Sequence, residues 1–155
     1  MRRPPHNLPD PACGEALVAE GIQLCVLASG SRGNATFFSD GTTRILIDAG
    51  LSGKEIERRL TSRRITAGAL DGILVTHEHN DHIQGVGVLS RRFKLPVYIS
   101  DATYSAAARQ LGKLHRQVPF RCGQSFTINQ IAIHPFSTSH DAADPAGFTF
   151  ETNGY

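Results

Sequence analysis

A run of six residues, His77-Glu78-His79-Asn80-Asp81-His82, places three histidines and an aspartate in one short segment. The run follows residues 72–76, whose largely apolar character is typical of a strand buried on both faces. Imidazole nitrogen and carboxylate oxygen are the usual ligands of borderline divalent metals such as zinc. The first two histidines can point toward one metal, and after a turn Asp81 and His82 can face a second. The run therefore predicts a dinuclear metal site at the end of a buried strand.

The same run has two other interpretations. It could be a polar, histidine-rich turn that only happens to follow a strand, but so many potential ligands in so short a segment favour a site. A helical zinc site of the HExxH type is excluded by spacing. The histidines after His77 stand two and five residues beyond it, whereas that motif requires four.

From residue 24 onward, short apolar runs separated by glycine and aspartate turns indicate a mixed fold, with strands first and strands alternating with helices afterwards. Asp40-Gly41 predicts a hairpin. Ser52 and Glu55 match a capping box, and Asp101 can cap another helix. The expected strands are residues 24–28, 36–38, 44–48, 72–76, 96–99, 126–128, 131–133 and 148–151; the expected helices are residues 53–60, 86–93 (with Val86, Val88, Leu89 and Phe93 on one face) and 101–111.

Composition limits the class of protein more than its function. With 155 residues, 40% apolar and 19% charged, the chain suffices for one globular domain or part of one. A formal charge of +2 would not by itself attract nucleic acid or a membrane, although the pairs Arg58-Arg59, Arg63-Arg64 and Arg91-Arg92 are compatible with a nucleic-acid surface. No apolar run approaches the roughly 20 residues that span a bilayer, which excludes an integral membrane protein.

The cysteines and the N-terminal segment bear on location. Cys13, Cys25 and Cys122 are odd in number, far apart and form no CxxC pair. This argues against a disulfide framework and a cysteine zinc site, and it favours a cytoplasmic location. Residues 1–21 contain paired arginines but lack the apolar stretch of an export signal, so we expect a flexible, proline-rich leader.

The segment from Thr76 to His82 resembles the HxHxDH signature of metallo-β-lactamase-fold hydrolases. Residues 27–35, 47–52 and 139–147 resemble the YycJ-like branch, also called WalJ-like or VicX-like. The resemblance implies an α+β fold with four layers in the order αββα. Residues 22–155 would form the N-terminal part of this domain, its first half to two-thirds. Asn153-Gly154 predicts a hairpin turn with only Tyr155 after it, so we expect a fragment.

The resemblance also implies roles for individual residues. It implies two divalent metal ions, zinc or alternatively manganese, with this ligand set: His77, His79 and His140 on the first ion, and Asp81 and His82 on the second. Asp81 would also help to position the attacking water, which makes it the candidate catalytic residue. Asp48 matches an aspartate that accepts a hydrogen bond from the histidine loop, although an aspartate capping a strand end before Gly50 would have the same pattern.

The remaining histidines differ in their surroundings. His140 alone would be unremarkable, but its Ser-His-Asp setting favours a ligand. His134 falls within a strand pattern, and His6 and His115 lie in polar, basic surroundings. We expect no metal role for these three.

The small-residue loop from Ser29 to Asn34 could present amides and hydroxyls to a phosphate. Ser29, Ser31 and Asn34 are therefore candidate substrate-binding residues, and an ordinary tight turn fits the loop equally well. It is not a Walker loop, because the Gly-Lys-Ser/Thr ending is missing.

These features together indicate hydrolysis by metal-activated water. The YycJ-like resemblance implies a phosphodiesterase or nuclease of exonuclease type, acting on nucleic acid and in particular on DNA. Hydrolysis of a small thioester or lactone is the enzymatic alternative, because the fold does not fix the substrate. A metal-containing regulatory module without turnover is the alternative from another class. The bridging carboxylate and a last histidine ligand would come from the second half of the fold, so we expect this chain alone to bind metal weakly, hold one ion or be inactive.

Overall fold

A computed structural model describes residues 21–152. Residues 1–20, which hold most of the expected leader with His6 and Cys13, and the hairpin signal Asn153-Gly154 lie outside the described residues. The strands are β1 (Gln23–Ala28), β2 (Ala35–Ser39), β3 (Arg44–Ile47), β4 (Gly72–Leu74), β5 (Pro96–Ser100), β6 (Arg116–Phe120), β7 (Phe126–Ile128), β8 (Ile131–Ser137) and β9 (Ala146–Glu151). The helices are α1 (Gly53–Ser62), the 3-10 turn η1 (Ala67–Ala69), α2 (Asn80–Ile83), α3 (Val86–Phe93) and α4 (Asp101–Leu111). Within residues 21–152, no helix is long and apolar enough to cross a membrane.

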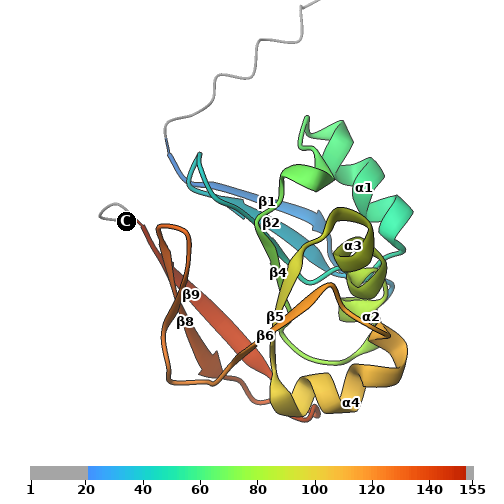
Figure 1. Ribbon diagram of the computed structural model, residues 1–155, viewed down its shortest axis with the longest axis vertical. Coiled ribbons are helices and arrows are strands. Elements are labelled where there is room, and N and C mark those ends of the chain that lie inside the picture. The colour runs from blue at the N-terminus through green and yellow to red at the C-terminus, as the bar shows by residue number, and fades with distance from the viewer. Residues whose placement is uncertain (1–20, 153–155) are drawn as a thin grey trace, which may run out of the picture.

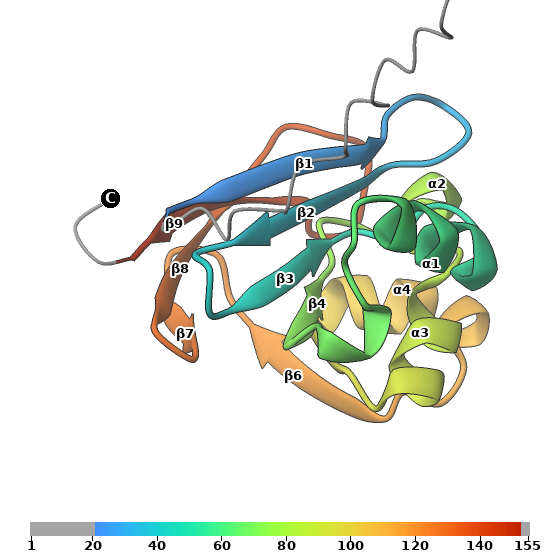
Figure 2. The same ribbon diagram turned by 90° about the horizontal axis from the view of Figure 1, so that it is seen from above.

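Six strands form the larger sheet, in the order β1-β2-β3-β4-β5-β6 (Figure 2). The first three pair antiparallel, and β3 to β6 pair in parallel. The predicted hairpin joins β2 to β3, where the Asp40 carboxylate accepts hydrogen bonds from the amides of Thr42 and Thr43. Because β3, β4 and β5 are parallel, their carboxyl ends meet at one edge of the sheet, and the loops that follow them lie close together there.

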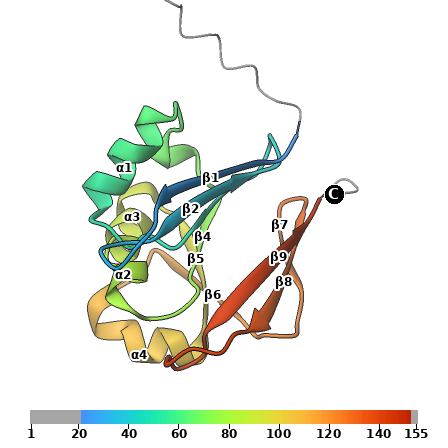
Figure 3. The ribbon, with the colours of Figure 1, turned by 180° about the vertical axis from the view of Figure 1, so that it is seen from behind.

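The strands β7, β8 and β9 form a smaller antiparallel sheet against one face of the larger sheet (Figures 1 and 3). Buried apolar side chains join the two sheets: Phe38, Ile45 and Leu74 from the larger sheet, and Ile128, Ile131 and Ile133 from the smaller one. The Ala146 amide, at the start of β9, donates to the Thr76 carbonyl just past β4 at 2.9 Å. The connection between β8 and β9 therefore reaches the edge where β4 ends.

The helices cover the opposite face of the larger sheet, so the layers run helix, sheet, sheet (Figure 1). The core between helices and sheet is apolar and closed to solvent, with Ile56, Leu60, Leu89, Ile73 and Val97 each at most 1% exposed. Strands and helices alternate from β3 to α4, as the sequence predicts. The described residues therefore supply three successive layers of the expected αββα fold, namely the helices, the larger sheet and the smaller sheet.

Two helix starts test the capping predictions. The Ser52 hydroxyl accepts a hydrogen bond from the Glu55 amide at 3.3 Å, so half of the predicted capping box forms. The Glu55 carboxylate does not accept a hydrogen bond from the Ser52 amide, which would complete the box. Hydrogen bonds from Arg58 and Arg59 occupy this carboxylate instead and lower its pKa to about 2. At α4 the cap is Ser100, so the prediction of Asp101 as the cap is wrong by one residue.

Two further features depart from the pattern in the sequence. The sequence does not predict β6, which is rich in polar residues and contains Pro119. The strand lies at the edge of the larger sheet, where the missing N–H of proline can face outward without losing a ladder bond. Val88, expected on the buried face of α3, is 47% exposed, because that helix packs through Val86 and Leu89.

Candidate metal centre

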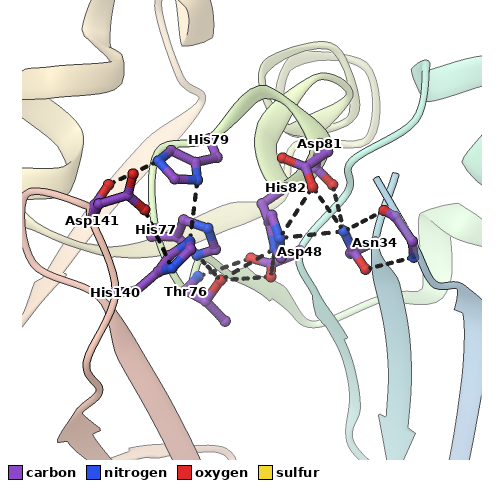
Figure 4. Close-up of polar contacts among 10 residues, drawn as sticks. Asn34, Asp48, Thr76, His77, His79, Asp81, His82, His140 and Asp141 are labelled. Carbon is purple, nitrogen blue, oxygen red and sulfur yellow. Dashed lines mark hydrogen bonds and ion pairs between the residues drawn. The ribbon is translucent and has the colours of Figure 1, made fainter. Parts of the chain in front are cut away.

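The predicted ligands come together where β3 and β4 end (Figure 4). Asp48 directly follows β3, the run from His77 to His82 begins just after β4, and His140 lies between β8 and β9. Parallel pairing of β3 with β4 brings the first two loops together. The bond from Ala146 to the Thr76 carbonyl then holds the third loop against the second. Three loops that are distant in sequence therefore supply one site.

His77, His79 and His140 form one group, in which one nitrogen from each ring lies within 4.8 Å of the others. The ring of His77 is buried, that of His79 is half-buried and that of His140 is exposed. Burial lowers the pKa of His77, and the neighbouring His82 adds to this effect. His77 is therefore a neutral imidazole at neutral pH, which is the form that binds a metal.

Hydrogen bonds around two of these rings decide which nitrogen carries the proton. The Thr76 hydroxyl donates to Asp48 Oδ2 at 2.7 Å, so its oxygen is left to accept from His77 Nδ1 at 2.9 Å. His79 Nε2 lies 3.0 Å from the Asp141 carbonyl oxygen, which can only accept (Figure 4). The lone pairs therefore stand on His77 Nε2 and on His79 Nδ1, and the latter lies 3.2 Å from His140 Nε2.

Asp81 and His82 form a second pair beside this group, with 3.6 Å between Asp81 Oδ2 and His82 Nε2. On the other side of the ring, His82 Nδ1 lies 2.7 Å from Asp48 Oδ2. Burial of the ring opposes its charged form, but the hydrogen bond and the charge of Asp48 outweigh burial and raise the pKa of His82. In the neutral ring the contact with Asp48 places the proton on Nδ1, which leaves Nε2 to face Asp81.

Asp48 connects the two halves of the site. Its side chain is buried, and its carboxylate accepts from the Thr76 amide at 2.8 Å, from the Thr76 hydroxyl and from His82. The backbone at Asp48 has a φ of 58°, in the left-handed region that aspartate and asparagine tolerate better than most residues. The residue thus contacts the histidine loop directly, which a simple cap of the strand end would not do.

Asn34, a candidate substrate-binding residue, turns toward the second pair. Its Nδ2 lies 3.1 Å from Asp81 Oδ2 and 3.3 Å from His82 Nε2, and its backbone amide donates to the Asp81 carbonyl at 2.7 Å. At Gly50, which donates its amide to the Asn34 carbonyl, a Cβ atom would lie 1.6 Å from the Asp81 carbonyl oxygen. Glycine at position 50 is therefore required for the loops that carry Asn34, Gly50 and Asp81 to approach this closely.

Other candidate residues lie apart from these groups. Ser29 and Ser31 line a pocket formed by the loop between β1 and β2. His134 lies on β8 and contacts Ser125 and Glu151.

Comparison with known proteins shows which fold and family this geometry represents. The metallo-β-lactamase fold protein YhfI from Bacillus subtilis matches with a TM-score of 0.69 and 22% identity, over 84% of this chain and 57% of that one. At this identity the likeness shows the fold alone. Residues 43–155 match the family described as the β-lactamase superfamily domain. This chain belongs to the metallo-β-lactamase superfamily.

Two relatives share more of the sequence. Exodeoxyribonuclease YycJ of Bacillus anthracis is 40% identical over 135 residues, which is 86% of this chain and 51% of that protein. Exodeoxyribonuclease WalJ of Streptococcus pneumoniae serotype 2 is 40% identical over 134 residues, which is 84% of this chain and 50% of that protein. The predicted resemblance to the YycJ-like branch is confirmed. The chain spans about half the length of these curated relatives.

The metallo-β-lactamase fold implies divalent metal ions, and one atom tests whether the residues of this chain fit them. His77 Nε2 is buried and has no hydrogen-bond partner among residues 21–152. Such atoms are rare, because leaving a buried polar group unpaired costs about 1–3 kcal/mol. Since this nitrogen carries a lone pair and lies with two further imidazole nitrogens, an electron-pair acceptor such as a metal ion is the partner that fits.

Glu78 contacts the site in a way that the motif does not reveal. Its Oε1 accepts a hydrogen bond from the Ala143 amide at 2.8 Å, while its Oε2 is buried without a partner among the described residues. The contact ties the loop that carries His140 to the loop that carries His77 and His79. In the sequence, the position of Glu78 inside the motif is the one feature that could suggest a role for it. Nothing in the sequence indicates that Ala143 is its partner.

Replacing Glu78 by alanine is expected to weaken metal binding by about tenfold to a hundredfold, because the Ala143 amide loses its acceptor and His140 is no longer held near the other rings. Glu78→Gln keeps an acceptor oxygen and should bind metal nearly as tightly as the wild type. Titration calorimetry of metal into the metal-free full-length protein measures both. Wild-type affinity in Glu78→Ala would show that this contact does not organise the site.

Proposed function

We propose that the full-length protein is a metal-dependent phosphodiesterase that degrades DNA as an exonuclease. Two divalent ions would be held by the described residues, one by His77, His79 and His140 and the other by Asp81 and His82. The observation that carries the proposal is the convergence of three imidazole nitrogens around the unpartnered, buried His77 Nε2. An imidazole-rich ligand set favours zinc over manganese.

The residues of this chain would orient the reacting groups. Divalent ions, when bound, would supply the remaining chemistry, because they lower the pKa of a water molecule toward about 7 and neutralise phosphate oxygens. Thr76 and the Asp141 carbonyl keep the lone pairs of His77 and His79 turned inward. Asp48 does the same for His82. The Asp81 carboxylate can accept a hydrogen bond from the attacking water and so aim it at the phosphorus atom.

Two observations support DNA as the substrate. Both relatives at 40% identity carry the name exodeoxyribonuclease. The chain also has paired arginines on α1 and α3, of which Arg58 and Arg59 pair with Glu55 and Arg92 pairs with Glu57. Basic groups near a phosphodiester substrate release counterions on binding, which makes the affinity depend on salt.

The test is to measure metal content and hydrolysis in the same preparation of full-length protein. We expect about two metal equivalents per chain, as in dinuclear hydrolases, and a sharp decrease in the double variant His79→Ala, Asp81→Ala. We also expect release of nucleotides from DNA ends, with a KM that rises steeply with salt. A thioester, as a neutral substrate, should show almost no salt dependence. Absence of metal, or turnover of a thioester but not of DNA, would contradict the proposal.

A further inference from the structure

The loop between β1 and β2 forms a pocket of about 300 Å³ beside the candidate metal centre. Residues 28–33, Leu51 and Arg59 line it. Asn34, the next residue along this loop, contacts Asp81 and His82. Figure 2 shows the loop beside α2, the short helix that carries Asp81 and His82. The pocket therefore neighbours the part of the centre proposed to hold the second ion.

The charged groups of the pocket are both basic. Arg59 is fixed in the wall, since its Nε donates to Glu55 at 2.8 Å and its Nη1 donates to the Leu27 carbonyl at 2.7 Å. Arg32 is exposed, and no ion pair or hydrogen bond engages its side chain within residues 21–152. No acidic side chain lines the pocket. An exposed guanidinium without an ion-pair partner among the described residues and a second guanidinium paired with Glu55 thus share a cavity whose lining contains no acidic residue.

The polar groups of the loop are also available to a ligand. Within the described residues, the hydroxyls of Ser29 and Ser31 have no hydrogen-bond partner, and both residues line the pocket. The loop keeps its shape without them. The Gly33 amide donates to the Gly30 carbonyl, and the Asn34 side chain bonds both the amide and the carbonyl of Gly30. Gly30 has a φ of 130°, a conformation that favours glycine.

We propose that this pocket is a phosphate subsite, in which Arg32, Arg59 and the two serine hydroxyls bind a backbone phosphate of a nucleic-acid substrate next to the phosphate that is cleaved. The proposal rests on the proposed function, because it adds a second contact for the same substrate. Guanidinium and hydroxyl groups are the donors that most often bind phosphate oxygens in nucleic-acid complexes. Contacts of this kind hold the strand in register without reading its sequence.

The experiment compares Arg32→Ala with Arg121→Ala in the metal-loaded full-length protein. Arg121 follows β6 and is also an exposed arginine, but it does not line the pocket. Two substrates are used, a DNA oligonucleotide and the small diester bis(p-nitrophenyl) phosphate, which is too short to occupy both sites. For Arg32→Ala we expect the KM for DNA to rise roughly tenfold more than the KM for the small diester. The slope of log KM against log salt for DNA should fall by about 0.7–0.9. Arg121→Ala should leave the KM for both substrates unchanged.

The possible results separate this proposal from the proposed function. Equal effects of Arg32→Ala on both substrates, or a lowered metal content, would mean that the loop acts through Asn34 and Asp81, and would overturn the subsite. DNA cleavage with an unchanged KM and salt slope in Arg32→Ala would overturn the subsite alone. Wild-type protein that holds its metal but neither binds nor cleaves DNA would overturn both. A smaller rise in the KM for DNA in Ser31→Ala would support the subsite independently of charge.

Discussion

Replacing His77 by alanine in the full-length protein is expected to remove most of the bound metal and to lower DNA hydrolysis by about three orders of magnitude or more. The side chain is buried, and its Nε2 has no hydrogen-bond partner among the described residues. The proposed ion would be the partner of this nitrogen. Alanine offers no ligand atom, and the remaining pair of nitrogens, from His79 and His140, belongs to a half-exposed and an exposed ring. Two imidazole ligands hold an ion far less tightly than three. Elemental analysis and the initial rate on DNA measure the two effects.

The matched control is His134→Ala. His134 is a partly exposed histidine that lies away from the centre and contacts Ser125, just before β7, and Glu151 on β9. Its replacement should leave the metal content and the rate unchanged. If His77→Ala kept its metal and its activity, and unfolded in the same transition as the wild type, the three-histidine group would not be the centre of the reaction.

Asp48→Ala is expected to destabilise the metal-free protein by about 3 kcal/mol or more. The change leaves the partly buried Thr76 donors and His82 Nδ1 without their acceptor, and each lost partner costs up to about 1–3 kcal/mol. Alanine also tolerates the left-handed backbone at this position poorly, at a cost of about 1–2 kcal/mol. Urea unfolding of the metal-free protein measures the difference.

Asp48→Asn separates folding from metal binding. Asparagine accepts the left-handed φ and can still bond the Thr76 amide through its oxygen, so the loss of stability should be smaller than in the alanine variant. Its NH₂ group then faces His82 Nδ1, which favours the tautomer with the proton on Nε2. That proton occupies the position from which His82 would bind the second ion, so we expect about tenfold to a hundredfold weaker binding of one equivalent. Equal affinity for both equivalents would show that Asp48 does not control this tautomer.

The ligand motif is the part of the site that the sequence predicts best, because histidines and an aspartate close together after a buried strand restrict the chemistry without knowledge of distant contacts. His140 is different. A lone histidine between two expected strands is a weak signal, which only its Ser-His-Asp setting and the resemblance strengthen, and the structure places its ring with His77 and His79. On the sequence alone, a strand-end cap and a support for the histidine loop fit Asp48 equally well, and the resemblance favours the support. Its contact with His82 depends on parallel pairing of β3 with β4.

The features that the sequence does not reveal are contacts between loops and a polar strand that is tolerated at the edge of a sheet. The bond of Glu78 to Ala143 joins residues 65 positions apart and needs both sheets in place. Asn34 looks like a phosphate-binding residue from its neighbours alone, whereas its side chain meets Asp81 only once Gly50 lets the loops approach. The polar strand β6 is recognisable only when its place beside β5 at the sheet edge is known.

The three-histidine group draws its members from both sheets, since two rings follow β4 and the third lies between β8 and β9. Apolar side chains and a few hydrogen bonds, such as that from Ala146 to Thr76, also hold the sheets together. A ligand that binds only the closed arrangement stabilises it by about 2.7 kcal/mol when its concentration is a hundred times the Kd. Metal supply and the docking of the smaller sheet would then form one linked equilibrium. Metal starvation would increase transient opening of that sheet, and with it amide exchange and exposure to proteases.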